Sequence, residues 1–320
     1  MSRRLGAGIL GAALALGMTV QAGAATLAEA NAALQAGEAD KALALLHSLP
    51  VTAQAHNLRC RVLYTLEKWN AAVDECQKAV AMEADNSEYH MWLGRALGEK
   101  ADRASFLSAF SLGKKVHAEF ELAVKLDSRN ASALADLGEF DYSAPGIVGG
   151  GMDKAQQVAE QLDHVDPVRA AELRGHIAET EKDYPTSERY LKEAIAASPQ
   201  PAFQWMALGS YYRRRKDWDQ MQTAVENGYR AAEHERRTGV ALYNGASILI
   251  QTGRDFDLAK KMLQQYLNGT SQTEEGPAFV AHVRLAKLDA ALGDKSAAWH
   301  EKAAALALAR EYKPAEELKF

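Results

Sequence analysis

The side chains best suited to chemistry are dispersed through this sequence. None of the nine histidines forms the His-x-x-x-His or His-Glu-x-x-His spacing with which a helix presents two metal ligands. A Gly-x-Ser-x-Gly nucleophile elbow is also absent. Acidic residues are numerous, but charges on helical repeats usually form the solvated face. The sequence therefore indicates no catalytic residue, no metal site and no cofactor.

One glycine run could bind phosphate. Gly149, Gly150 and Gly151 lie within the segment APGIVGGG, and glycines expose backbone amides where a helix begins. The run matches neither G-x-x-x-x-G-K-[ST] nor G-x-G-x-x-G, and no strand pattern precedes it. We expect Asp153 to cap a helix there instead.

Composition limits the class of protein. The 320 residues include 37 basic and 42 acidic side chains, for a formal net charge of −5. Alanine makes up roughly a fifth of the chain, which favours helices over strands. The acidic balance argues against nucleic-acid binding, which requires clustered basic surface. Two cysteines are too few for a disulfide-dense scaffold.

The first 24 residues resemble an export signal. Arg3 and Arg4 precede an apolar run from Leu5 to Val20, and Ala22 and Ala24 fit the small positions before a cleavage site. We expect cleavage after Ala24 and, in a bacterium, a periplasmic protein. A retained membrane anchor is the alternative. No later stretch has the length and apolarity to span a membrane.

Small and large apolar residues recur at intervals of about 34 residues over the rest of the chain. The segment WMALGSYYRRRKDW (205–218) places Trp, Leu-Gly, Tyr and a second Trp in order. The segment IAETEKDYPTSERYLKEAIAASP (177–199) supplies the second half of such a unit and its closing proline. Recurring small residues are expected where helices cross; they are Gly94, Gly138, Gly175, Gly209, Ala42, Ala72, Ala155 and Ala298.

These repeats resemble the tetratricopeptide repeat (TPR), and about eight units cover residues 25–320. The resemblance implies an all-α, right-handed superhelix of helix hairpins with a long concave groove. It also implies which first-helix positions line that groove: Asn57, Arg61, Tyr64, Met91, Arg95, Glu139, Tyr142, Phe203, Met206, Ser210 and Arg213.

Within this set, Arg61 and Arg95 are expected to be neighbours. A guanidinium pair can capture the carboxylate of an acidic or C-terminal peptide. Structural ion pairs with nearby glutamates are the favoured alternative. The chaperone-tail clamp of the TPR family is not reproduced, because Asn57 lacks its lysine companions.

Two units depart from the repeat, at residues 98–115 and 142–155. Both insertions are expected between the two helices of a unit, on one edge of the superhelix, where they should touch. Their apolar residues would then meet: Phe106, Leu107, Phe110 and Leu112 from the first insertion, and Pro145, Ile147 and Val148 from the second. A local plug over exposed repeat surface is the favoured interpretation, and a partner-binding lip is the alternative.

The two cysteines, Cys60 and Cys76, lie in the same unit. Export would permit a disulfide. Helices packed at ~8–10 Å usually hold their backbones too far apart for one, so buried, reduced thiols are favoured.

These observations predict a non-catalytic periplasmic scaffold that binds a protein or peptide partner of the cell envelope. The alternatives are an enzyme accessory, or a small-molecule or glycan binder that uses the APGIVGGG loop or the groove aromatics. A shallow, open groove would favour the scaffold. An enclosed pocket with perturbed carboxylates or histidines would favour an enzyme. The partner's identity and the oligomeric state stay open.

Overall fold

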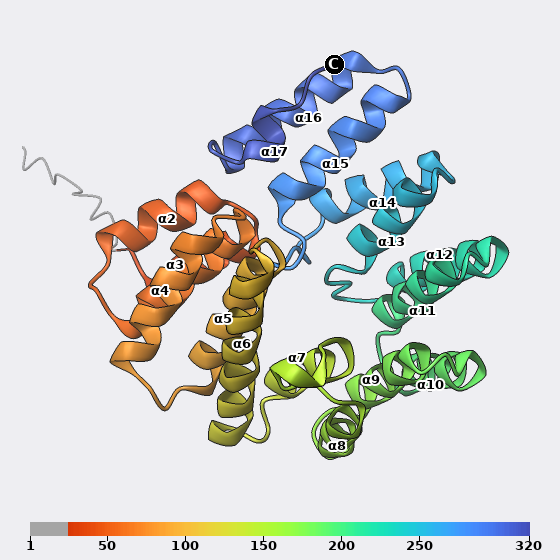
Figure 1. Cartoon of the computed structure of the whole chain (residues 1–320). Helices are drawn as coiled ribbons and strands as arrows, with labels where there is room; N and C mark the ends of the chain where they lie inside the picture. The colour runs from red at the N-terminus through yellow and green to blue at the C-terminus, as the bar shows by residue number, and fades with distance from the viewer. Residues whose placement is uncertain (1–24) are drawn as a thin grey trace, which may run out of the picture.

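The computed structural model describes residues 25–320, and this part of the chain is helical with no strand. Eight antiparallel hairpins follow one another, with a short final helix (Figure 1). The helices are α1 (Leu27–Gln35), α2 (Ala39–Ser48), α3 (Ala53–Thr65), α4 (Trp69–Met82), α5 (Ser87–Asp102), α6 (Phe106–Leu126), α7 (Ala131–Ser143), the 3₁₀ turn η1 (Gly146–Val148), α8 (Met152–Asp163), α9 (Pro167–Thr180), α10 (Tyr184–Ala197), α11 (Ala202–Arg215), α12 (Trp218–Ala232), α13 (Ala241–Thr252), α14 (Phe256–Asn268), α15 (Ala278–Ala291), α16 (Lys295–Leu308) and α17 (Lys313–Glu316). The predicted all-α solenoid of about eight units is confirmed.

Helix starts are fixed by local capping. In four of the second helices, an Asp side chain accepts a hydrogen bond from a first-turn amide and so satisfies one of the unpaired donors there. These caps are Asp183, Asp217, Asp255 and Asp294. The expectation for Asp153 is wrong, because Gly151 is the N-cap of α8 and Asp153 lies in the first turn.

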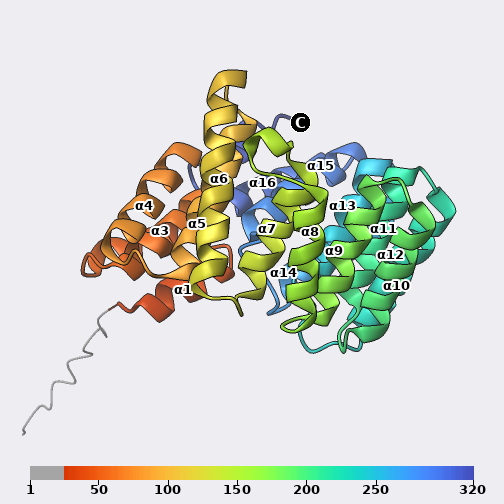
Figure 2. The same ribbon diagram turned by 60° about the horizontal axis from the view of Figure 1, so that its bottom comes forward.

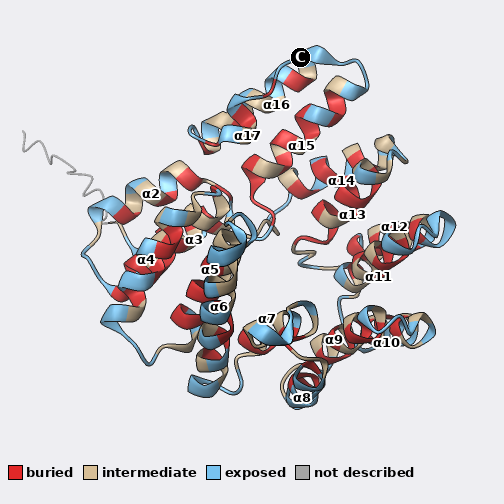
Figure 3. Ribbon diagram, in the orientation of Figure 1, coloured by how far each residue is buried: buried red, intermediate tan, exposed pale blue. Residues whose placement is uncertain are grey.

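Small residues allow the helices to approach one another. A Cβ atom at Gly94 would lie only 2.5 Å from the ring of Phe120 on the paired helix. Ala42, Ala72, Ala155 and Ala298 are fully buried at the corresponding crossings. Figure 3 shows the buried residues concentrated on the faces where helices meet. The predicted role of these positions is confirmed.

Cys60 of α3 and Cys76 of α4 form a disulfide, so the preference for reduced thiols is wrong. Their Cα atoms lie 5.2 Å apart, within the range that a disulfide requires. Both residues are completely buried at the α3–α4 crossing. The general helix spacing overestimated the separation, because small residues such as Ala72 bring these two backbones closer than average.

The insertion at 98–115 does not form a loop. It lengthens α5 and α6, which reach 16 and 21 residues and are joined by a short turn. The insertion at 142–155 contains η1, and the two do touch, since a Cβ at Gly113 would lie 3.4 Å from Val148. Phe106 and Leu107 were expected to take part in this contact, and that prediction is wrong. They lie at the far end of the hairpin and are exposed.

The superhelix closes on itself. In Figure 1, α15, α16 and α17 return beside α2 and α3. One apolar cluster contains Leu34 and Leu58 from the first helices together with Phe279, Val283 and Tyr312 from the last. The concave face is therefore surrounded by a ring of helices, and it remains open to solvent.

The predicted export signal lies outside residues 25–320. Within the described chain, no helix combines the length and the apolarity needed to cross a membrane.

Replacing Cys60 and Cys76 with alanine tests the disulfide. The cross-link joins residues 16 apart in sequence. Its loss should lower the free energy of unfolding by about 3 kcal/mol, because the unfolded chain gains conformational entropy. Urea unfolding of the native and double-alanine proteins measures the difference. The unsubstituted protein can also be denatured without reductant and its free thiols counted. Finding two free thiols would contradict the assignment.

Candidate functional site: a cavity closed by Arg61 and Glu274

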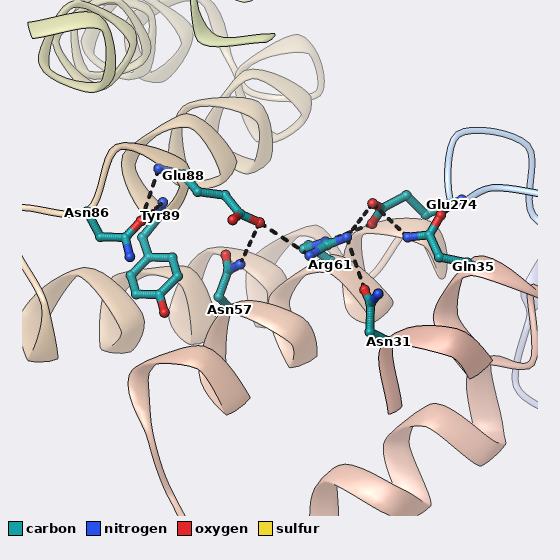
Figure 4. Close-up of polar contacts among 8 residues, drawn as sticks. All are labelled: Asn31, Gln35, Asn57, Arg61, Asn86, Glu88, Tyr89 and Glu274. Carbon is teal, nitrogen blue, oxygen red and sulfur yellow. Dashed lines mark hydrogen bonds and ion pairs between the residues drawn. The ribbon is translucent and has the colours of Figure 1, made fainter. Parts of the chain in front are cut away.

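Arg61, on α3, joins the two ends of the superhelix (Figure 4). Its Nε donates to Glu274 Oε2 at 2.9 Å and its Nη2 to Glu274 Oε1 at 2.5 Å. Glu274 lies in the α14–α15 loop and is also held by Gln35 of α1, whose Nε2 donates at 3.1 Å. The two side chains of the ion pair are only 13% and 12% exposed. This bidentate contact is therefore a shielded clasp between segments 213 residues apart.

Arg95, on α5, is engaged in a second internal ion pair. Its Nε donates to Asp136 Oδ2 of α7 at 2.5 Å and its Nη2 to Asp136 Oδ1 at 3.1 Å. The guanidinium carbons of Arg61 and Arg95 lie 5.3 and 4.7 Å from the ring centre of Trp92. The two arginines are thus neighbours. The expected ion pair with a glutamate is confirmed for Arg61, whereas Arg95 pairs with an aspartate instead. Neither guanidinium is left to receive the carboxylate of a partner.

Burial shifts the pKa of groups in both ion pairs. Burial would lower the pKa of Arg61, but Glu274 and Glu88 outweigh it and raise that pKa. The pKa of the Asp136 carboxyl is raised by burial, against the opposing effect of Arg95. Arginine remains charged in either case, so deprotonation of a guanidinium does not break either ion pair in the physiological pH range.

Two connected cavities occupy the concave side. The first, of about 760 Å³, lies among α3, α5, α7 and the segment 274–284. The second, of about 1210 Å³, lies among α7, α9, α11 and the segment 235–244. Glu139 and Glu275 line both, so they mark the passage between them.

The other groove positions have varied locations. Tyr64 and Arg95 line the first cavity, and Tyr142 and Phe203 line the second. Asn57 and Met91 are buried among the helices and line neither cavity. Arg213 is not buried, but it also lines neither cavity. Glu139 is exposed to the interior space, as its repeat position implied.

Carboxylates dominate the first cavity. Seven acidic and three basic side chains line it; they are Glu67, Glu99, Asp102, Asp136, Glu139, Glu274 and Glu275, and Arg95, Arg103 and Arg284. Arg103 is paired with Glu99 at 2.7 Å. Within residues 25–320, no hydrogen bond or ion pair engages the carboxylates of Asp102, Glu139 and Glu275. Burial and the neighbouring Asp136 raise the pKa of the Glu139 carboxyl, and the positive charges of His176 and Arg95 offset this only in part.

The second cavity contains both signs of charge. Burial raises the pKa of Glu172, although Gln204 donates to it. Burial opposes ionisation of Glu179 as well, but hydrogen bonding and charge from Arg214 and His176 lower its pKa to about 2. The raised pKa values of Glu139 and Glu172 meet one part of the criterion for an enzyme, but the cavities are open to solvent and do not meet the other. No group of three or more His, Cys, Asp or Glu side chains in the described chain is arranged to hold a metal ion.

Sequence reasoning missed Glu274, Trp92 and the free carboxylate of Glu275. Glu274 and Glu275 belong to the segment GTSQTEEGP, which reads only as a polar connection between helices. This segment lies beside α1 and α3 because each hairpin is rotated relative to the one before it, and the rotations add up over the superhelix. No local signal could have revealed it.

Replacing Arg61 with methionine tests the clasp. The change leaves the buried carboxylate of Glu274 without its cation and should cost about 3–5 kcal/mol of unfolding free energy. The double variant Arg61→Met with Glu274→Gln should lose less unfolding free energy than the two single variants lose together. Arg174→Met is the matched control, because its pair with Asp163 is more exposed and should be worth about 1 kcal/mol or less. Equal losses at Arg61 and Arg174 in urea unfolding would contradict the assignment.

No protein-family model matches this chain, and no curated protein sequence matches it. Solved structures with a similar fold include MamA, at 14% identity and a TM-score of 0.35 over 54% of this chain and 93% of that one. Yeast Tom70 matches at 15% identity and 0.47 over 83% of this chain and 62% of Tom70. Pseudomonas aeruginosa PilF matches at 13% identity and 0.39 over 83% and 95%. These similarities concern the helical fold alone, and we base no functional argument on them.

Proposed function

We propose that this chain is a non-catalytic interaction protein that holds a basic polypeptide segment of a partner inside its ring. The observation that carries the proposal is the set of unpaired carboxylates in the first cavity, Asp102, Glu139 and Glu275. A lysine or arginine side chain would supply the missing countercharge. Solvent reaches Glu139 and Glu275, so an incoming ligand can reach them as well.

The size and walls of the cavities suit such a segment. Sites for single small molecules are typically ~300–1,000 Å³, and the second cavity alone is about 1210 Å³ and continues into the first. A preformed cavity lowers the entropic cost of ordering an extended ligand.

A glycan is less well suited to the same space. Sugars stack on open aromatic faces, but Arg103 lies 4.5 Å from the ring centre of Trp69 and Arg95 lies 4.7 Å from that of Trp92. These two faces are already covered. An enzyme remains the second candidate, favoured by the raised pKa of Glu139 and of Glu172.

The cellular location is part of the proposal. The charged start, apolar run and small residues before Ala25 support export and a partner in the cell envelope. N-terminal sequencing of the protein from a periplasmic fraction should begin at Ala25. An uncleaved Met1 would contradict this location.

Binding of fluorescent peptides tests the function. A lysine- and arginine-rich peptide should bind, and its glutamate-rich counterpart should not. Glu139→Gln with Glu275→Gln should weaken binding by about tenfold, because two ligand-facing charges are lost (~1.4 kcal/mol). Affinity should also fall as pH drops toward 4.5, because the raised pKa of Glu139 makes it accept a proton earlier than a free glutamate.

The matched control is Glu160→Gln with Glu181→Gln, which removes two exposed charges outside both cavities. Unchanged binding in the cavity variant, or an equal loss in the control, would contradict the proposal. Chemical turnover of a bound peptide that the Glu139 substitution abolishes would establish the enzyme instead.

A further inference from the structure

The α5–α6 hairpin extends beyond the other helices and ends in exposed apolar residues (Figure 2). Phe106 and Leu107, in the first turn of α6, are 85% and 81% exposed. They are the most exposed large hydrophobic side chains in the described chain. Adjacent apolar residues this exposed on a projecting tip usually mark a contact with another surface.

The charge around the tip differs from that of the whole protein. Residues 98–115 contain four basic and two acidic side chains, whereas the chain as a whole is acidic. One of the two acids, Glu99, is paired with Arg103, and the other, Asp102, lines the first cavity. Lys114 and Lys115 are exposed, and the Lys114 ammonium lies 4.6 Å from the ring centre of Phe110.

The spacing of these groups along α6 matches the layers of a lipid surface. Lys114 follows Leu107 by seven residues, which correspond to ~10 Å along a helix. Interfacial apolar groups enter a bilayer by ~5–10 Å. A cation that lies ~10 Å farther along the helix axis is then at the level of the lipid phosphates. Lysine side chains can extend toward that level while their stems remain against apolar groups. Val148 of η1 packs beside Gly113, and the adjacent Ile147 is 70% exposed.

We propose that the tip of the α5–α6 hairpin binds the surface of a membrane that contains anionic lipids. Phe106 and Leu107 enter the outer part of the acyl layer, and Lys114 and Lys115 contact lipid phosphates. The tip is convex, which suits insertion into a deformable layer. Two apolar side chains and two cations give weak, reversible binding, since even a whole myristoyl chain anchors only marginally. This proposal is independent of what the cavity holds.

Vesicle co-sedimentation of the chain beginning at Ala25 tests it, with phosphatidylcholine vesicles that contain or lack phosphatidylglycerol. The native protein should bind the anionic vesicles preferentially and release them at high salt. Phe106→Ser with Leu107→Ser should reduce the partition coefficient at least about tenfold. Lys114→Gln with Lys115→Gln should abolish the preference for anionic lipid.

The matched control is Val51→Ser with Leu292→Ser, which changes two exposed apolar residues on other parts of the surface and should leave binding unaltered. All the substituted side chains are exposed, so melting temperatures should agree. Failure of the native protein to bind, or equal binding by the Phe106/Leu107 variant, would overturn the proposal. Sedimentation velocity provides a further test. If the native protein is a dimer and the Phe106/Leu107 variant is a monomer, the tip is an interface between copies and the proposal is overturned.

Discussion

The closure of the helical array by Arg61 and Glu274 is the constraint on which the other features depend. An apolar cluster that includes Leu34 and Phe279 brings the two ends together, and the ion pair fixes how they meet. Clustered apolar surface supplies most of the energy of such a contact, while a shielded bidentate pair supplies geometry. Closure converts the concave face into two connected cavities. It also uses the guanidinium that would otherwise have been available to a ligand.

Much of the architecture follows from local rules that the sequence displays. The number of hairpins and the small residues at their crossings were both predictable from repeating positions. The disulfide was not, because a general helix spacing does not report how closely α3 and α4 approach at Ala72. The insertion at 98–115 was expected between the two helices of its unit, but it extends both helices and displaces the turn outward.

The candidate site was predictable only where repeat position determines which way a side chain faces. Glu139, Tyr64, Tyr142 and Phe203 face the cavities as the repeat implied. The sign of the cavity's charge could not be deduced this way. It depends on Arg61 and Arg95 being neutralised by Glu274 and Asp136, and on Glu275 entering from a loop near the other end of the chain. Closure thus removes the basis for an acidic ligand, the less favoured interpretation of Arg61 and Arg95, and it leaves a cavity lined mainly by carboxylates.

Zero-length carbodiimide cross-linking tests closure most directly, because it joins only amines and carboxylates already in contact. Lys68 Nζ and Glu311 Oε2 lie 2.6 Å apart across the junction, although 243 residues separate them in sequence. Lys192 and Glu188, also 2.6 Å apart, provide an internal control within one helix. A closed ring predicts a Lys68–Glu311 cross-linked peptide from the monomeric protein. Recovery of the Lys192–Glu188 product without the Lys68–Glu311 product would contradict the account.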